Sequence, residues 1–144
     1  KLFYLTTDSG AVHVVGYPDF EIVRSLNGHT AIVYCLAQSD EYLACGSADA
    51  LVSLWSLSEM ACVRTFSRLE YPVRTLSFSH DGRYLASASE DLLIDISDVT
   101  TGDRVAAVPT NGAMNSIAWC PTRHLLAFAG LLRSVYFLRF TRAS

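Results

Sequence analysis

The chain has 144 residues, of which 51% are hydrophobic and 17% are charged, and this balance excludes an intrinsically disordered chain. Its formal net charge of −3 excludes a chain-wide positive field for non-specific nucleic-acid binding, so any RNA contact is expected to be indirect or weak. No apolar run approaches the roughly 20 residues that a membrane-spanning helix needs, and we expect no membrane partner.

The cysteines indicate a reducing compartment. The four lie at positions 35, 45, 62 and 120, inside apolar runs, and form no Cys-x-x-Cys pair. This pattern argues against a zinc site and against a disulfide framework. The nucleus or the cytoplasm is therefore the expected location.

All the predicted elements are strands, because apolar residues alternate with small or polar ones and no segment keeps a helical period. In chain order, the expected strands cover residues 2–6, 11–15, 21–26, 32–37, 42–47, 51–56, 61–66, 73–79, 84–89, 93–97, 104–108, 114–120, 124–129 and 134–140. Short turns such as "SHDGR" and "TTGD" separate the strands.

The strands repeat with a period of about 40 residues. The stretch from Tyr42 to Trp55 matches residues 84–97 with an offset of 42, and Leu36, Leu76 and Ile117 recur at offsets of 40 and 41. A repeat of this length with three or four short strands indicates β-propeller blades. We expect an all-β, single partial propeller domain over residues 1–144, with blades at about 1–26 (incomplete), 28–66, 68–108 and 113–140, the last lacking its final strand.

The second repeat resembles the WD-repeat family. It opens with Gly28-His29, turns at Asp49 and carries Trp55 in its third strand. The resemblance implies a hydrogen-bonded tetrad of structural residues inside the blade, with Cys45 where the family has a hydroxyl and Ser47 two residues further on. The implied tetrad-like residues are His29, Cys45, Ser47, Asp49 and Trp55 in this blade and Ser87 and Asp91 in the next.

A narrower resemblance covers roughly residues 28–140. The stretches "GSADALVSLWSL", "FSRLEYPVRTLSFS", "DLLIDISDV" and "IAWCPTRHLLAFAG" are similar to the third-subunit family of the THO complex. The resemblance implies a non-catalytic scaffold in a nuclear THO/TREX-type assembly that couples transcription to mRNA processing and export. Its partners would be other protein subunits, with no cofactor and no small-molecule substrate.

The same resemblance implies a ring of seven blades, of which this chain would supply about three and three-quarter blades as the C-terminal half. The chain begins with Lys1 rather than Met, which suggests a piece of a longer protein. The alternative function is that of a WD-repeat adaptor of another assembly, such as a ubiquitin-ligase substrate receptor.

Enzymatic function is disfavoured. His29, Asp49 and a nearby hydroxyl have the residue types of a hydrolase, but a nucleophile must be oriented by its base in an open site, whereas this spacing is typical of a turn brace. His13, His80 and His124 fall in unrelated strand and turn positions. We predict no catalytic, cofactor-binding or metal-binding residues.

Arginines surround the aromatic turn "LEYPV". Arg and Tyr are enriched at interface hot spots, so the candidate partner-binding residues are Arg64, Arg68, Tyr71 and Arg74. The alternative interpretation is that Arg64 and Arg74 are strand residues whose stems cover apolar surface while their charged ends stay in water.

Overall fold

The computed structural model describes residues 1–131 and 133–141. All regular secondary structure in these residues is β-strand, and no helix able to cross a membrane occurs among them. The strands are β1 (Leu2–Thr6), β2 (Ala11–Gly16), β3 (Ile22–Asn27), β4 (Val33–Gln38), β5 (Tyr42–Ser47), β6 (Val52–Ser56), β7 (Ala61–Phe66), β8 (Thr75–Phe78), β9 (Tyr84–Ala88), β10 (Leu93–Asp98), β11 (Arg104–Pro109), β12 (Met114–Trp119), β13 (Leu125–Gly130) and β14 (Val135–Arg139).

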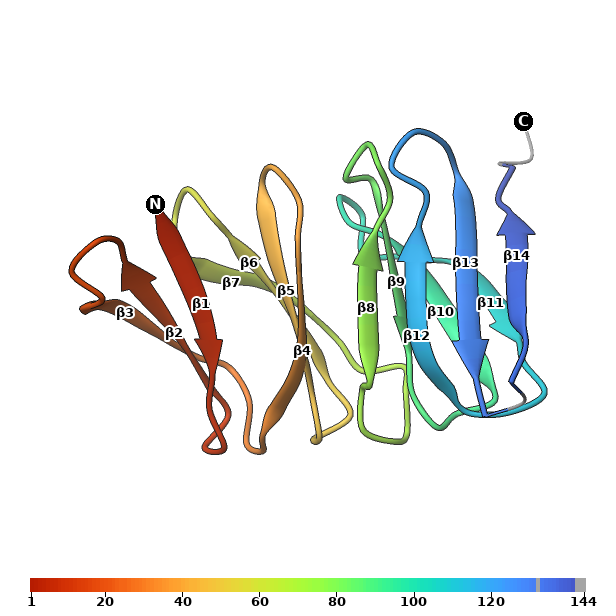
Figure 1. Cartoon of the computed structure of the whole chain (residues 1–144), viewed down its shortest axis with the longest axis horizontal. Coiled ribbons are helices and arrows are strands. Elements are labelled where there is room, and N and C mark those ends of the chain that lie inside the picture. Colours follow the sequence, from red (N-terminus) through yellow and green to blue (C-terminus); the bar gives the residue numbers. More distant parts are fainter. Residues whose placement is uncertain (132, 142–144) are drawn as a thin grey trace.

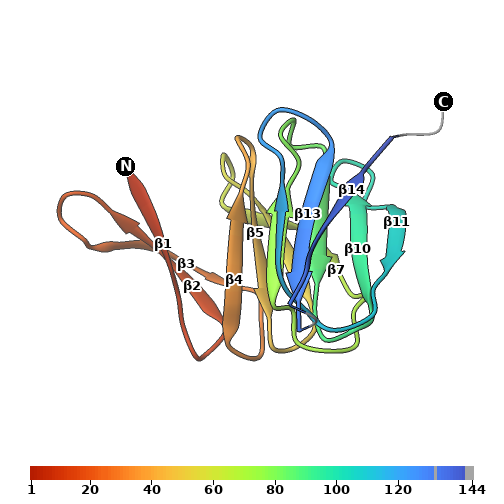
Figure 2. The ribbon, with the colours of Figure 1, turned by 45° about the vertical axis from the view of Figure 1, so that its right-hand side comes forward.

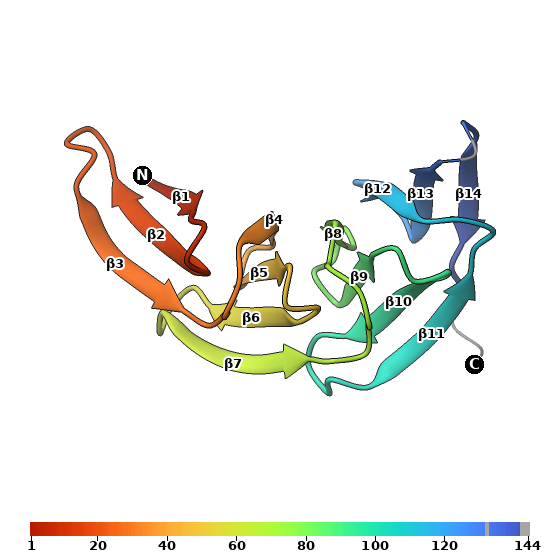
Figure 3. The same cartoon turned by 90° about the horizontal axis from the view of Figure 1, so that it is seen from below.

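These strands form four antiparallel sheets in which strands adjacent in sequence are paired (Figure 1). The first sheet contains β1–β3, the second β4–β7, the third β8–β11 and the fourth β12–β14. Seen from below, the sheets follow an arc, with β4, β8 and β12 on its concave side and β3, β7 and β11 on its convex side (Figure 3). Four meanders arranged in this way are consecutive blades of a propeller, as the repeat predicts.

The middle strands are buried because each complete sheet is covered on both faces. Strand β9 is buried along its whole length, and β10 along all but its first residue. Small side chains suit this position: Ala86 and Ala88 pack with Ile117 and Trp119 of the fourth sheet. At Gly46, a Cβ atom would lie 2.6 Å from Val73 Cγ1, so glycine is required where the second sheet approaches the third.

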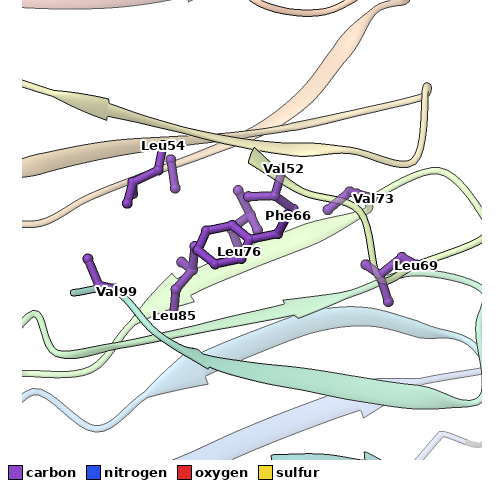
Figure 4. Close-up of a cluster of buried hydrophobic side chains, with 9 residues drawn as sticks. Val52, Leu54, Phe66, Leu69, Val73, Leu76, Leu85 and Val99 are labelled. Atoms are coloured by element: carbon purple, nitrogen blue, oxygen red, sulfur yellow. The ribbon is translucent and has the colours of Figure 1, made fainter. Parts of the chain in front are cut away.

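The apolar core lies between adjacent sheets. Figure 4 shows the cluster between the second and third sheets, in which Val52, Leu54 and Phe66 pack against Leu76 and Leu85. Complete burial of one such side chain contributes about 1.5 to 3 kcal/mol. Because each sheet buries its faces against its neighbours, the two end sheets each keep one uncovered face, as the turned view shows (Figure 2).

The strand bounds agree with the sequence-based expectation to within two residues at each end. The largest difference is at β8, which begins at Thr75 rather than at residue 73. The amide of Val73 donates a hydrogen bond to the Ser47 carbonyl of the second sheet, at 2.9 Å. Val73 therefore belongs to the crossing between two sheets, although its alternation with Thr75 predicts a strand.

Candidate functional site

A chain of hydrogen bonds braces the second sheet. The Nε1 of Trp55 donates to Ser53 Oγ at 2.8 Å, and Ser53 Oγ lies 2.8 Å from His29 Nε2. His29 Nδ1 lies 3.0 Å from Asp49 Oδ2. The indole can only donate and the carboxylate can only accept, so Nδ1 of His29 carries a proton, and in the neutral imidazole Nε2 accepts the Ser53 hydroxyl.

Local sequence places each member of this brace. Ser53 and Trp55 are two residues apart on β6 and so share one face of the sheet. Asp49 lies in the turn between β5 and β6, where it accepts the amide hydrogens of Thr30 and Leu51 at 3.0 Å each. Gly28 leaves room for the indole, since a Cβ atom there would lie 2.7 Å from Trp55 Cζ2.

The electrostatics of Asp49 follow from these donors. Burial alone would raise the pKa of this carboxyl group, but the amides of Thr30 and Leu51 and the His29 imidazole outweigh burial and lower the pKa below its ordinary value. The carboxylate is therefore charged at neutral pH. It provides a stable acceptor for the histidine, whose side chain is only 1% exposed.

The hydroxyl of the brace belongs to Ser53, so the expected place of Cys45 in the tetrad is wrong. Cys45 on β5 and Ser53 on β6 are directly paired across the two strands. The hydroxyl is therefore on β6, at the position that faces the predicted one on β5. Burial raises the pKa of Cys45 to about 12, which keeps it a neutral thiol. Ser47 instead stabilises the turn, donating to the carbonyls of Ala31 and Ile32 at 3.0 Å each.

The order Asp49, His29, Ser53 has the connectivity of a hydrolase relay, but its surroundings do not suit catalysis. Ser53 is 1% exposed and its oxygen also accepts the indole hydrogen. A nucleophile needs an open position where an electrophile can approach. The geometry therefore fits an internal brace.

The third sheet replaces this brace with an ionic cluster. The repeat offset of 42 puts Asp95 at the position of Ser53 and Ser97 at that of Trp55. Asp95 is 2% exposed, and its carboxylate accepts hydrogen bonds from Ser97 Oγ at 2.7 Å and from Arg104 Nε. Arg68 completes the cluster, with Nη1 3.6 Å from Asp95 Oδ2 and 2.6 Å from Ser97 Oγ.

Asp91 stabilises the turn between β9 and β10, which precedes Asp95 in the chain. Its Oδ2 accepts the amide hydrogens of Glu70 and Tyr71 at 2.9 and 3.3 Å and the hydroxyl of Ser89 at 2.5 Å. The hydroxyl partner is therefore Ser89 rather than the expected Ser87. Ser87 instead faces Asp95 across β9 and β10, the same relation that Cys45 has to Ser53.

Replacement of Asp91 by Ala is expected to lower the free energy of unfolding by about 1 to 3 kcal/mol, because the amides and the hydroxyl lose their acceptor. Urea unfolding followed by circular dichroism measures this change. Glu90→Ala is the matched control: Glu90 is half exposed and pairs with Arg74 at the surface, and such pairs contribute about 0 to 1 kcal/mol. An equal loss in both variants would contradict the assigned role of Asp91.

The four candidate partner-binding residues separate into two pairs. Arg64 and Arg68 both reach the turn after β10, where they donate to the carbonyls of Thr100 and Gly102 at 3.0 and 2.6 Å. Tyr71 and Arg74 lie toward the turn before β10, where Arg74 Nη2 donates to Glu90 at 3.2 Å. Since Arg68 is used inside the fold, its guanidinium is less available to a partner than its sequence position suggests.

Arg74 of the second pair also reaches the second sheet. The guanidinium carbon of Arg74, the residue directly before β8, lies 4.7 Å from the ring centre of Tyr34 on β4. Tyr34 and Tyr71 are 44% and 51% exposed. Tyr34 and Arg74 therefore present an aromatic ring and a guanidinium group side by side, a composition typical of interface hot spots.

A hollow of about 1030 Å³ lies between the second and third sheets, next to the turns between β4 and β5 and between β8 and β9. Leu76, Phe78 and Val99 give it an apolar part, while Asp40 and Glu41 add exposed carboxylates. His80 and Asp81 also line it. Sequence position gave no reason to associate His80 with His124, yet their rings lie 4.7 Å apart, centre to centre.

The cysteines differ in their expected reactivity, because the thiolate is the nucleophile. A hydrogen bond from the Thr122 hydroxyl helps lower the pKa of Cys120 to about 7, whereas burial raises the pKa of Cys35 and Cys45 to about 12. At pH 7, iodoacetamide should label Cys120 rapidly and leave Cys35 and Cys45 unlabelled until the chain unfolds. Peptide mass spectrometry over a time course measures this order, and early labelling of Cys45 would contradict it.

Comparison with known proteins gives consistent results. The sequence model of the WD domain, G-beta repeat family matches residues 20–56 and 60–94. THO complex subunit 3 of Arabidopsis thaliana is 53% identical over 130 residues, which cover 89% of this chain and 41% of that protein. WD repeat-containing protein AAC3 of Dictyostelium discoideum is 39% identical over 74% of this chain and 23% of that protein.

Solved structures show the same fold. A structure of U3-55K superimposes with a TM-score of 0.89 at 19% identity, over 96% of this chain and 45% of that one. A chain from a crystal structure of the mitotic checkpoint complex gives 0.88 at 24% identity, with the same coverage. The chain spans about two fifths of the length of the Arabidopsis relative. With its braced four-stranded meanders and the family match over two repeats, the chain belongs to the WD domain, G-beta repeat family.

Proposed function

We propose that this chain is part of a non-catalytic scaffold subunit of a THO/TREX-type complex, acting in the nucleus in transcription-coupled mRNA processing and export. The observation that carries the proposal is the 53% identity to THO complex subunit 3 over 89% of the chain. The buried position of Ser53 supports a non-catalytic role. The subunit would hold seven blades, and its partners would be other protein subunits, with RNA contacted indirectly or weakly.

Within this proposal, partner contacts fall on exposed side chains that the fold does not use internally. Tyr34, Tyr71 and Arg74 are the best placed, because they combine two exposed aromatic rings with a guanidinium that is partly exposed. Truncating a hot-spot residue of this kind costs about 2 kcal/mol of binding free energy or more. The side chains of Arg64 and Arg68 contribute less, since they bond to the turn after β10.

Affinity purification from nuclear extract, with and without ribonuclease, followed by mass spectrometry tests the assembly. Recovery of the other THO-type subunits in near-equal amounts after ribonuclease would support a scaffold held by protein contacts. Recovery of ubiquitin-ligase subunits, or of no stable partner, would overturn the proposal. A Tyr71→Ala, Arg74→Ala variant should recover less of its partners, while Arg64→Ala, the matched control, should recover the parental amount.

A further inference from the structure

Three potential metal ligands meet where the third and fourth sheets adjoin. His80 and Asp81 lie in the turn between β8 and β9, and His124 lies directly before β13. One ligand atom from each residue can be chosen so that all three lie within 4.8 Å of one another. His124 Nε2 is already 3.0 Å from Asp81 Oδ2.

We propose that His80, Asp81 and His124 form a binding site for a divalent transition-metal ion of the zinc type that links the two sheets. Imidazole nitrogen and carboxylate oxygen are both good ligands for this class of ion. Around a tetrahedral zinc ion, with ligands at about 2.0 to 2.1 Å, the ligand atoms would lie roughly 3.3 Å apart. Side-chain rotations that shorten these separations, now at most 4.8 Å, would bring the atoms to this spacing.

The aspartate is held in position by the fold. Ser79, which is 4% exposed, donates its hydroxyl to Asp81 Oδ1 at 2.6 Å, and the amide of Arg83 donates to the same oxygen at 3.2 Å. Oδ2 is thereby turned toward His124. Partners that orient a ligand from behind are typical of metal sites.

The two histidines differ in how firmly packing holds their side chains. His124 is half-buried, with its ring centre 5.4 Å from that of Tyr84 and 6.2 Å from that of Trp119. This packing fixes His124, whereas His80 is exposed and can rotate toward the site. Three protein ligands leave one tetrahedral position for water or for a side chain of a partner.

Cobalt(II) is the probe for the test, because its visible absorption reports tetrahedral coordination directly. The starting protein is the Cys62→Ser, Cys120→Ser variant, which removes the exposed thiol and one of the two half-buried thiols. Titration of cobalt(II) into this protein should give one equivalent of tetrahedral complex, and zinc(II) should displace it. Zinc(II) should also raise the Tm of this protein.

His80→Gln is the decisive variant, because His80 is exposed and its loss leaves the hydrogen bond between His124 and Asp81 in place. It should weaken cobalt binding by at least about tenfold and abolish the zinc-dependent rise in Tm. His13→Gln is the matched control, since His13 bonds to Ser25 in the first sheet, and it should bind as the starting protein does. No tetrahedral spectrum, or equal affinity in His80→Gln, would overturn the proposal and leave His124 and Asp81 as a hydrogen-bonded pair.

Discussion

Replacing Ser53 by Ala is expected to lower the free energy of unfolding by about 3 kcal/mol. The substitution leaves the Trp55 indole hydrogen and the His29 Nε2 without a partner, and each unpaired buried polar group costs roughly 1 to 3 kcal/mol. Both side chains are too deeply buried for water to replace the hydroxyl easily, since Trp55 is 7% exposed and the His29 side chain 1%. Urea unfolding followed by circular dichroism, at low protein concentration, measures the change.

The two tryptophans supply a matched control for this network. Trp119 is as buried as Trp55, at 7% exposure, but its Nε1 has no hydrogen-bond partner among the described residues. Both Trp→Phe substitutions lose similar apolar volume, and only Trp55→Phe also loses a hydrogen bond, so it should be the more destabilising by about 1 kcal/mol. Equal losses in the two variants, or a Ser53→Ala protein as stable as its parent, would contradict the brace.

The 144 residues alone are expected to self-associate. Both end sheets expose large apolar side chains: Phe20 and Val23 in the first sheet and its turns are 65% and 66% exposed, and Val135 and Phe137 on β14 are 62% and 69% exposed. Exposed apolar patches favour association, and β1 and β14 add unpaired strand edges. Size-exclusion chromatography with light scattering should show a mass that increases with protein concentration.

Substitutions can distinguish self-association through the two end sheets from association through any exposed apolar residue. Phe20→Ser combined with Phe137→Ser should shift the distribution toward the monomer. Leu92→Ser is the matched control, because Leu92 is 61% exposed but lies in the turn between β9 and β10, away from the end sheets. A concentration-independent monomer that unfolds in a single cooperative transition would refute the prediction.

Much of the fold could be predicted because its signal is local and repeated. Period-two alternation indicates each strand, and an offset of about 40 residues makes successive meanders equivalent. The contact between His29 and Asp49 accords with the WD-repeat resemblance. Neither inference needs knowledge of which strand residues face one another.

Predictions were wrong where the identity of a hydrogen-bonding residue depends on which strand residues face one another. Ser53 replaces Cys45 because the two residues face each other across β5 and β6, a relation that depends on strand register. The Ser-x-Trp spacing of Ser53 and Trp55 was the available signal, since residues two apart share a face. When each strand is considered separately, the hydroxyl is predicted on β5, whereas it lies on β6.

Contacts between sheets were harder to foresee. Arg68 joins Asp95 and Ser97 only because the segment after β7 packs against the third sheet. His124 meets Asp81 because equivalent turns of adjacent sheets are side by side. Such contacts join residues far apart in the sequence, and they depend on how the sheets are arranged around the arc.

The different braces of the second and third sheets imply different responses to ionic strength. The Asp95 cluster relies on ion pairs with Arg68 and Arg104, whose side chains are 30% and 37% exposed. Ion pairs that reach solvent weaken as ionic strength rises, because the Debye length shortens from about 10 Å at 0.1 M to about 3 Å at 1 M. The His29 network is shielded by burial. Raising the salt concentration should therefore speed amide hydrogen exchange in β10 and β11 relative to β5 and β6, so that ionic strength changes the relative stability of two adjacent blades.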